Sequence, residues 1–204
     1  MNNIKFRRIS AYLIDYLFIF LIITMLSQIR VLNPTYDEYY EAYDRYMEIY
    51  DDLSVDNALE IVESAEYQEV NYDLSRYSVS ISIISLVVYL AYFVGFQKWN
   101  KNQTLGKKMF NIEVVSNDGK SASWLQILLR EVIIYNIVWE ILVIISIFVF
   151  NYEGYMIASS VLSLIAGIIL WVSVLFIIFR KDGRGLHDII AKTKVVGKEQ
   201  DNGN

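Results

Sequence analysis

Two acidic side chains stand inside long apolar runs of the sequence. Asp15 interrupts the run from Ile9 to Ile29, and Glu140 lies near the middle of a run that ends near Phe150. A carboxylate at the centre of a membrane-spanning helix costs roughly 2.5–3.5 kcal/mol on insertion scales, so it usually has a partner or a task. A buried carboxyl group can also carry a proton, because burial raises its pKa. Both acids are therefore candidates for an ion or proton pathway.

Each candidate has a structural alternative. Asp15 can be satisfied by a neighbouring arginine or tyrosine and serve only helix packing. Asn136 precedes Glu140 by one helical turn, and on one helix face the two would offer three oxygens to a cation. Glu140 can equally reach the outer interface beside Trp139, with no part in a pathway. The sequence leaves both interpretations open for each acid.

Other kinds of site find little support. The chain has no cysteine and one histidine, His187, which excludes a thiolate or histidine-cluster metal site within one chain. His187 adjoins Asp188, but no nucleophile is in view, so we expect a structural hydrogen bond there rather than catalysis. The stretch Gly106–Lys108 lacks the spaced glycine and the Ser/Thr of a phosphate-binding loop. We expect no enzyme activity, cofactor, metal site or nucleic-acid partner.

Four apolar runs must position these side chains. A run of about 20 apolar residues crosses the ~30 Å hydrocarbon core as a helix. Lipid cannot satisfy free backbone groups, and these runs do not alternate as barrel strands do. We predict an all-α membrane protein, one domain over residues 1–204, with a four-transmembrane-helix bundle, a small cytoplasmic β-sheet and an extracytoplasmic helical hairpin. The predicted spans are about 9–29, 77–97, 131–150 and 156–179.

The charges fall into two groups. Residues 30–76 hold thirteen Asp/Glu and three Arg, a net charge of −10, whereas the remainder holds fifteen Lys/Arg and ten Asp/Glu, a net charge of +5. Basic residues cluster before the first run and after the second and fourth. With four spans all these clusters fall on one side, which is the cytoplasmic side by the positive-inside rule. We therefore expect a protein of the plasma membrane whose two termini, loop 98–123 and tail 180–204 lie in the cytoplasm. The acidic insertion 30–76 then lies on the outer side.

The segments between the runs also show periodicity. Tyrosines recur at steps of three and four between Tyr36 and Tyr50, and a second helical stretch is predicted from Val55 to about Tyr67, so the insertion is expected to form the hairpin. Apolar and polar residues alternate from Phe110 through Ile112 and Val114, a turn is predicted at 117–119, and residues 191–196 are predicted to form a second strand. We expect the two strands to pair, because an isolated strand leaves its backbone groups without partners.

Four motifs follow one another along the chain. They are Arg7-Arg8-Ile-Ser-Ala11-Tyr-Leu-Ile14-Asp15, Gln103-Thr-Leu-Gly106-Lys107-Lys108, Leu128-Leu129-Arg130, and Asp182-Gly-Arg184-Gly-Leu186-His187-Asp188 continuing to Val196. In order and placement they resemble the RDD family of prokaryotic membrane proteins over nearly the whole chain. The resemblance implies a set of signature charged residues: Arg8, Asp15, Arg130, Asp182, Arg184, His187 and Asp188. The long acidic insertion and Glu140 depart from the family pattern.

The resemblance also implies a function. The family is suspected of transport, and cation/proton exchange has been proposed for some members. We therefore expect a transporter of monovalent cations or protons that uses Asp15, with Asn136 and Glu140 as further pathway candidates. Four spans are few for a transporter, which suggests a homo-oligomer. The alternative is a non-enzymatic scaffold or accessory subunit that binds a protein partner.

Two expectations concern the charged residues near the span ends. Arg8 should meet Asp188 or Asp182, and such an arginine–carboxylate pair would clasp the tail against the bundle. Arg130 and Glu131 are expected to be interfacial anchors rather than pathway residues.

Overall fold

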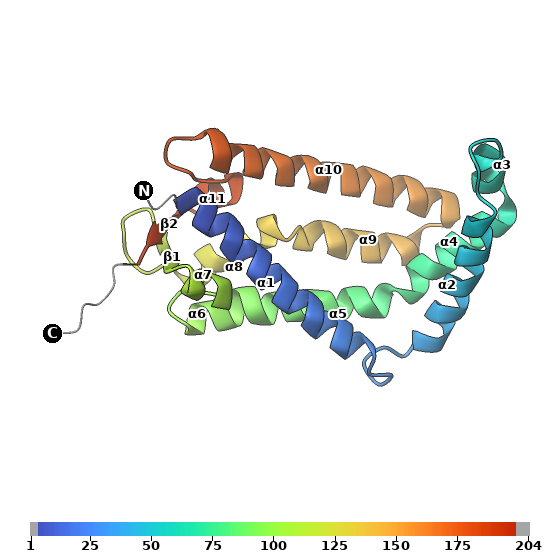
Figure 1. Cartoon of the computed structure of the whole chain (residues 1–204), viewed down its shortest axis with the longest axis horizontal. Helices are drawn as coiled ribbons and strands as arrows, with labels where there is room; N and C mark the ends of the chain where they lie inside the picture. Colours follow the sequence, from blue (N-terminus) through green and yellow to red (C-terminus); the bar gives the residue numbers. More distant parts are fainter. Residues whose placement is uncertain (1–3, 199–204) are drawn as a thin grey trace. The chain divides into compact units, whose positions relative to one another are not determined.

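The computed structural model describes residues 4–198, which are mostly helical with one small sheet (Figure 1). The chain forms two compact units. The first comprises the described residues of Met1–Ile22, Leu86–Trp139 and Ser163–Asn204, and the second comprises Ile23–Ser85 and Glu140–Leu162. Long helices contribute to both units, so each unit combines stretches that are distant in the sequence.

Long apolar helices make up much of the described chain. Three are long and apolar enough to cross a membrane, and a bent pair of helices would make a fourth if it counts as one span. This supports a membrane protein with three or four candidate spans. The three are α1 (Ile4–Ser27), α10 (Tyr152–Phe179) and the continuous helical stretch Ala65–Trp99, which is made of α4 (Ala65–Tyr77), α5 (Val79–Tyr89), the π-helix η1 (Leu90–Phe96) and α6 (Gln97–Trp99).

The third predicted span is not one straight helix. The pair α8 (Trp124–Ile134) and α9 (Ile137–Val149) is bent by 59°. Asn136 lies in the break with a left-handed φ of 53°, a conformation that asparagine tolerates better than most residues. The expected unbroken helix over 131–150 was therefore wrong, and the helical turn that would have set Asn136 on one face with Glu140 is not formed.

The small sheet belongs to the first unit. β1 (Ile112–Ser116) pairs antiparallel with β2 (Thr193–Gly197), with Val114 opposite Val195, which confirms the predicted pairing. In Figure 1 the strands lie next to α7 (Leu105–Met109) and α11 (Leu186–Ile190). The sheet packs into a cluster of buried apolar residues of this unit, which includes Ala11, Val94, Ile112, Val114, Ala122, Ile127 and Val195.

The second unit contains the predicted helical hairpin. α2 (Tyr36–Asp51) packs along α4, where Arg45 pairs with Asp73 at 3.0 Å. The short helix α3 (Ala58–Glu63) precedes α4, and Ser64 separates the two and caps α4 by accepting a hydrogen bond from the Tyr67 N–H. The hairpin is confirmed, although its second helical stretch is interrupted at Ser64.

Candidate functional site

A cavity of about 330 Å³ lies within the first unit. Its lining comes from α1, α7, α8, α10, α11 and the sheet. One wall is apolar and belongs to α10, with Leu170, Trp171, Val174, Ile177 and Ile178; we call it the apolar wall. The remaining lining is rich in ionisable side chains: Arg8, Asp15, Lys107, Arg130, Glu131 and His187. Together with Asp188, these residues form what we call the charge cluster, which holds three cationic and three acidic groups beside the histidine.

Asp188 is the centre of the charge cluster and is fully buried. Its Oδ2 accepts hydrogen bonds from Arg8 Nη2 at 2.6 Å and from the Gly185 N–H at 3.0 Å, while Oδ1 lies 3.1 Å from Arg130 Nε. Burial by itself would raise the pKa of Asp188. The guanidinium groups of Arg130 and Arg8 outweigh burial and hold that pKa below its usual value. Asp188 is therefore a permanent anion that joins α11 to α1 and α8.

Glu131 and Lys107 form a second, looser part of the cluster. Glu131 Oε1 accepts a hydrogen bond from Gln97 Nε2 at 3.1 Å and lies 3.8 Å from Lys107 Nζ. Burial lowers the pKa of Lys107 to about 8, with the negative charge of Glu131 opposing part of that shift. A group with such a pKa can gain and lose its proton near neutral pH.

Asp15 is enclosed by three donors. Tyr92 donates its hydroxyl proton to Oδ1 at 2.7 Å, the Gly106 N–H donates to Oδ1 at 2.8 Å, and Thr104 donates to Oδ2. Gly106 must be a glycine, because a Cβ atom there would stand 2.2 Å from the backbone oxygen of Ala11. Asp15 thus fastens the first turn of α7 tightly against α1, which is the packing role that the sequence left open.

Tyr92 lies in the π-helical segment η1, where the helix contains a wider turn than an α-helix. Its hydroxyl also accepts a hydrogen bond from the Leu105 N–H at 3.0 Å, so one side chain links η1, Asp15 and the start of α7. π-Helical turns occur often at functional sites. This turn sets a buried tyrosine opposite the buried acid.

His187 is held by Ser173 on α10, with Nδ1 and the serine oxygen 2.6 Å apart. Burial lowers the pKa of His187 to about 3, so the ring is neutral at physiological pH. Its Nε2 lies 3.4 Å from Arg8 Nη2, which can only donate, so Nε2 acts as the acceptor there. The expected structural hydrogen bond for His187 agrees with this geometry.

Comparison with known proteins assigns the chain to a family. The model of the RDD family matches residues 5–192, which is nearly the entire chain. The chain belongs to the RDD family. No curated protein and no solved structure matches it.

Five of the seven charged residues assigned to the RDD signature meet in the charge cluster: Arg8, Asp15, Arg130, His187 and Asp188. The other two lie outside it. Asp182 pairs with Arg180 and with Arg184, each at 2.9 Å, and these groups are partly exposed. Arg8 therefore meets Asp188, and not Asp182, of the two partners that the sequence allowed.

Arg130 and Glu131 are placed differently from the expectation. Their exposed fractions are 3% and 1%, and both line the cavity. The expectation of interfacial anchors was wrong, because α8 turns these side chains inward, toward Asp188 and Lys107. The RDD motif Leu128-Leu129-Arg130 thus supplies the second guanidinium of the Asp188 site.

Several site residues escaped sequence reasoning. Tyr92 lies in an apolar run and carries no signal of its own, and neither Gln97 nor Ser173 belongs to one of the four motifs. Thr104, Gly106 and Lys107 stand inside the second RDD motif, so the motif held a signal for these three. Among residues 4–198 no group of three or more His, Asp and Glu side chains is arranged to hold a metal ion.

Proposed function

We propose that this RDD protein exchanges protons for monovalent cations across the plasma membrane of a prokaryote. The observation that carries the proposal is the cavity, in which the acids Asp15 and Glu131 and the buried Lys107 line one space beside an apolar wall. Apolar helices long enough to cross a membrane contribute to that lining. Titratable groups at one cavity are what a proton-coupled carrier needs, because proton release and cation uptake must share a site.

We assign the carrier role to Glu131 rather than to Asp15. Asp15 accepts three hydrogen bonds, and its loss would detach α7 from α1. Glu131 uses the single oxygen Oε1 for its hydrogen bond from Gln97 and for its contacts with Lys107 at 3.8 Å and Arg130 at 3.5 Å. A carboxylate with one heavily used oxygen can bind a cation or a proton with less rearrangement. Lys107, whose pKa is about 8, would compensate the charge when Glu131 changes its ligand.

We further propose how the protein is oriented in the membrane and that it forms a homo-oligomer. Several residues of the charge cluster come from the basic loop 98–123 and the tail 180–204. By the positive-inside rule the cluster would then lie at the cytoplasmic end of the spans, with both termini in the cytoplasm. A bundle of so few spans would reach a complete pathway as a homo-oligomer.

The test is reconstitution of the full chain into liposomes that contain a pH-sensitive dye. An imposed Na⁺ or K⁺ gradient should drive a pH change with the wild-type protein and none with Glu131→Gln. Glu140→Gln is the matched control, because Glu140 is also an acid in an apolar helix but does not line the cavity. Its flux should equal that of the wild type.

Two results would count against the proposal. One is a wild-type flux no greater than that of empty vesicles. The other is full activity of Glu131→Gln together with loss of activity in Glu140→Gln, which would move the pathway to Glu140. Size-exclusion profiles of both variants should match the wild type, so that a folding defect is not mistaken for a lost carrier.

A second candidate function is a scaffold that binds a basic protein through the hairpin. α2 exposes Tyr40, Tyr43 and Tyr50, and the segment at α3 exposes Val55 and Leu59, by 98% and 79% respectively. Exposed tyrosines are favoured at protein interfaces, and the acidic surroundings would select a positively charged partner. Crosslinking in whole cells should then yield one stoichiometric basic partner that is lost in Tyr43→Ser combined with Leu59→Ser. Recovery of the same partner with this double variant would contradict the scaffold.

A further inference from the structure

The cavity opens to the side of the first unit between α1 and α10. Trp171, Ile178 and Ile9 all line it, yet they are 68%, 47% and 48% exposed. A lining residue that is half exposed marks an opening. The residues of the apolar wall recur at helical spacing along α10, so the opening runs along one face of that helix.

An opening of this kind cannot be filled by water without cost. The side chains of the apolar wall are aliphatic or aromatic, so water against this wall would lack hydrogen-bond partners and an apolar molecule is favoured on that side of the cavity. Because α1 and α10 are long enough to cross a membrane, the opening would face lipid chains. The cavity volume of about 330 Å³ lies at the lower end of ligand sites, which suits one segment of an acyl chain.

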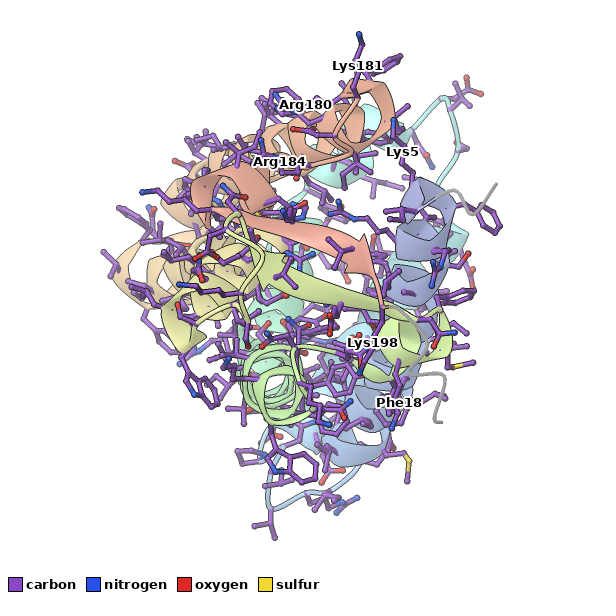
Figure 2. All side chains as sticks on the ribbon, turned by 90° about the vertical axis from the view of Figure 1, so that its left-hand side faces the viewer. Lys5, Phe18, Arg180, Lys181, Arg184 and Lys198 are labelled. Atoms are coloured by element: carbon purple, nitrogen blue, oxygen red, sulfur yellow. The ribbon has the colours of Figure 1, made fainter. Side chains whose placement is uncertain are left out.

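The ends of α1 and α10 beside this opening are basic. Lys5 Nζ donates a hydrogen bond of 2.6 Å to the carbonyl oxygen of Ile178, in the last turn of α10. Figure 2 shows Lys5 on α1, and Arg180 and Lys181 after α10, at this end of the unit. Lys181 is exposed, whereas Arg180 shares Asp182 with Arg184. The three cationic and three acidic groups of the charge cluster balance, so the mouth carries an excess of positive charge.

Arg130 adds donors inside the cavity. Its Nε and Nη1 lie near Asp188 and Glu131, at 3.1 and 3.5 Å, but among the described residues neither atom makes a hydrogen bond of acceptable angle. The side chain is 3% exposed and lines the cavity. Asp188 and Glu131 hold this guanidinium inside the cavity, so the groups that can meet a phosphate at the mouth are the exposed cations at the ends of α1 and α10.

We propose that an anionic phospholipid from the surrounding bilayer binds this cavity, with an acyl chain against the apolar wall and its phosphate at the basic mouth. The lipid seals the apolar opening and leaves the polar lining of Asp15, Lys107 and Glu131 to the inside. This inference does not rest on cation exchange, because lipid binding is measured without flux. Failure of the exchange experiment leaves it standing.

The experiment is a lipid titration of the full chain in detergent, followed by native mass spectrometry. Phosphatidylglycerol and phosphatidylcholine with identical acyl chains are compared, and inorganic phosphate serves as the free-anion arm. We expect tighter binding of phosphatidylglycerol and no retained phosphate. Lys181→Gln should weaken the binding of phosphatidylglycerol by about fivefold, since one cation near a headgroup contributes about that factor to the affinity. The affinity for phosphatidylcholine should not change.

Two further variants distinguish the contributions of the apolar wall and of the basic mouth to lipid binding. Trp171→Ala removes an exposed part of the wall, so it should fold normally and weaken both lipids. Lys120→Gln is the matched control for the mouth, because Lys120 is 84% exposed in the turn after β1 and should not affect either lipid. Equal affinity for the two lipids, or an unchanged affinity in both Trp171→Ala and Lys181→Gln, would overturn the inference. Retention of inorganic phosphate at the same strength would assign the mouth to free phosphate instead of a lipid.

Discussion

Arg8 donates a hydrogen bond of 2.6 Å to Asp188, which follows it by 180 residues in the sequence. The side chains are 8% and 0% exposed, so the pair lies away from water, where a charge-assisted hydrogen bond is strong. It ties the start of α1 to α11, and Arg130 from α8 completes the grip on the same carboxylate. The segment from Asp182 to Gly197 is therefore part of the folded first unit rather than an appendage to it.

Asp188→Asn should loosen the tail. The substitution removes the ion-pair partner of the buried Arg8 and leaves Arg130 with Glu131 alone, and breaking such a buried pair typically costs about 3–5 kcal/mol. The measurement is trypsin cleavage after Lys192 and Lys194, which should become rapid under conditions where the wild type resists. Asp182→Asn is the control, because its exposed ion pairs contribute about 0–1 kcal/mol and its tail should stay protected. Equal resistance of Asp188→Asn and the wild type would refute the clasp.

Gly106→Ala should destabilise the fold by about 2 kcal/mol or more. Its new methyl group would overlap the backbone oxygen of Ala11 and would have to push α7 away from α1. Gly167→Ala is the matched control on α10, since nothing lies within 4 Å of its Cβ position. That change should be neutral or slightly stabilising, as alanine favours a helix more than glycine does. Thermal melting in detergent would reveal the difference, and coincident melting curves would disprove the close approach.

Tyr92→Phe should lower the free energy of unfolding by roughly 1–3 kcal/mol. It removes the donor to Asp15 and leaves the part-buried Leu105 N–H without its acceptor. Tyr16→Phe, on the same helix as Asp15 but 50% exposed, should leave stability unchanged. Urea or denaturing-detergent unfolding monitored by tryptophan fluorescence provides the comparison. A loss of the same size in both variants would mean that the hydroxyl of Tyr92 is not specifically required.

His187 should give the protein a stability that depends on pH between about 3 and 6.5. Its folded pKa is lowered from 6.5 to about 3 by burial, with Arg130, Arg8 and Lys107 acting in the same direction and Asp188 against them. In this window the unfolded chain binds a proton that the folded chain does not, so stability falls as the pH drops. His187→Gln should melt with a shallower pH dependence between pH 6.5 and 4. If the melting temperatures of the wild type and His187→Gln fell in parallel with pH, His187 would not be a neutral buried imidazole in the folded protein.

The helices and the sheet could be predicted from local patterns because their causes are local. A continuous apolar run has no partner for its backbone in lipid other than itself, so the runs around Asp15 and in α10 had to be helical. Residues 110–114 alternate in polarity and a turn follows at 117–119, which is the pattern of a half-buried strand. The break at Asn136 was missed, since asparagine inside an apolar run also fits a continuous helix.

The site was predictable only in part. The sequence motifs marked Arg8, Asp15 and Asp188 as important, and the pairing of Arg8 with an aspartate of the tail followed from their positions at the ends of segments on one side. Tyr92, Lys107 and Glu131 could not be assigned, because their role depends on which way η1, α7 and α8 turn. A rotation of α8 by half a turn would have left Glu131 at the lipid interface, as expected from its place in the sequence.

The sequence by itself determined that this chain consists of membrane-type helices with a paired sheet and a charged tail, since hydrophobic run length and residue alternation act over a few residues at a time. Only the tertiary structure decided that Arg8, Lys107, Arg130 and Asp188 share one buried space and that Asp15 is closed off by Tyr92, Thr104 and Gly106. The reason is that buried charges select their partners by distance and low dielectric across segments far apart in the chain, and neither quantity exists until the helices have packed.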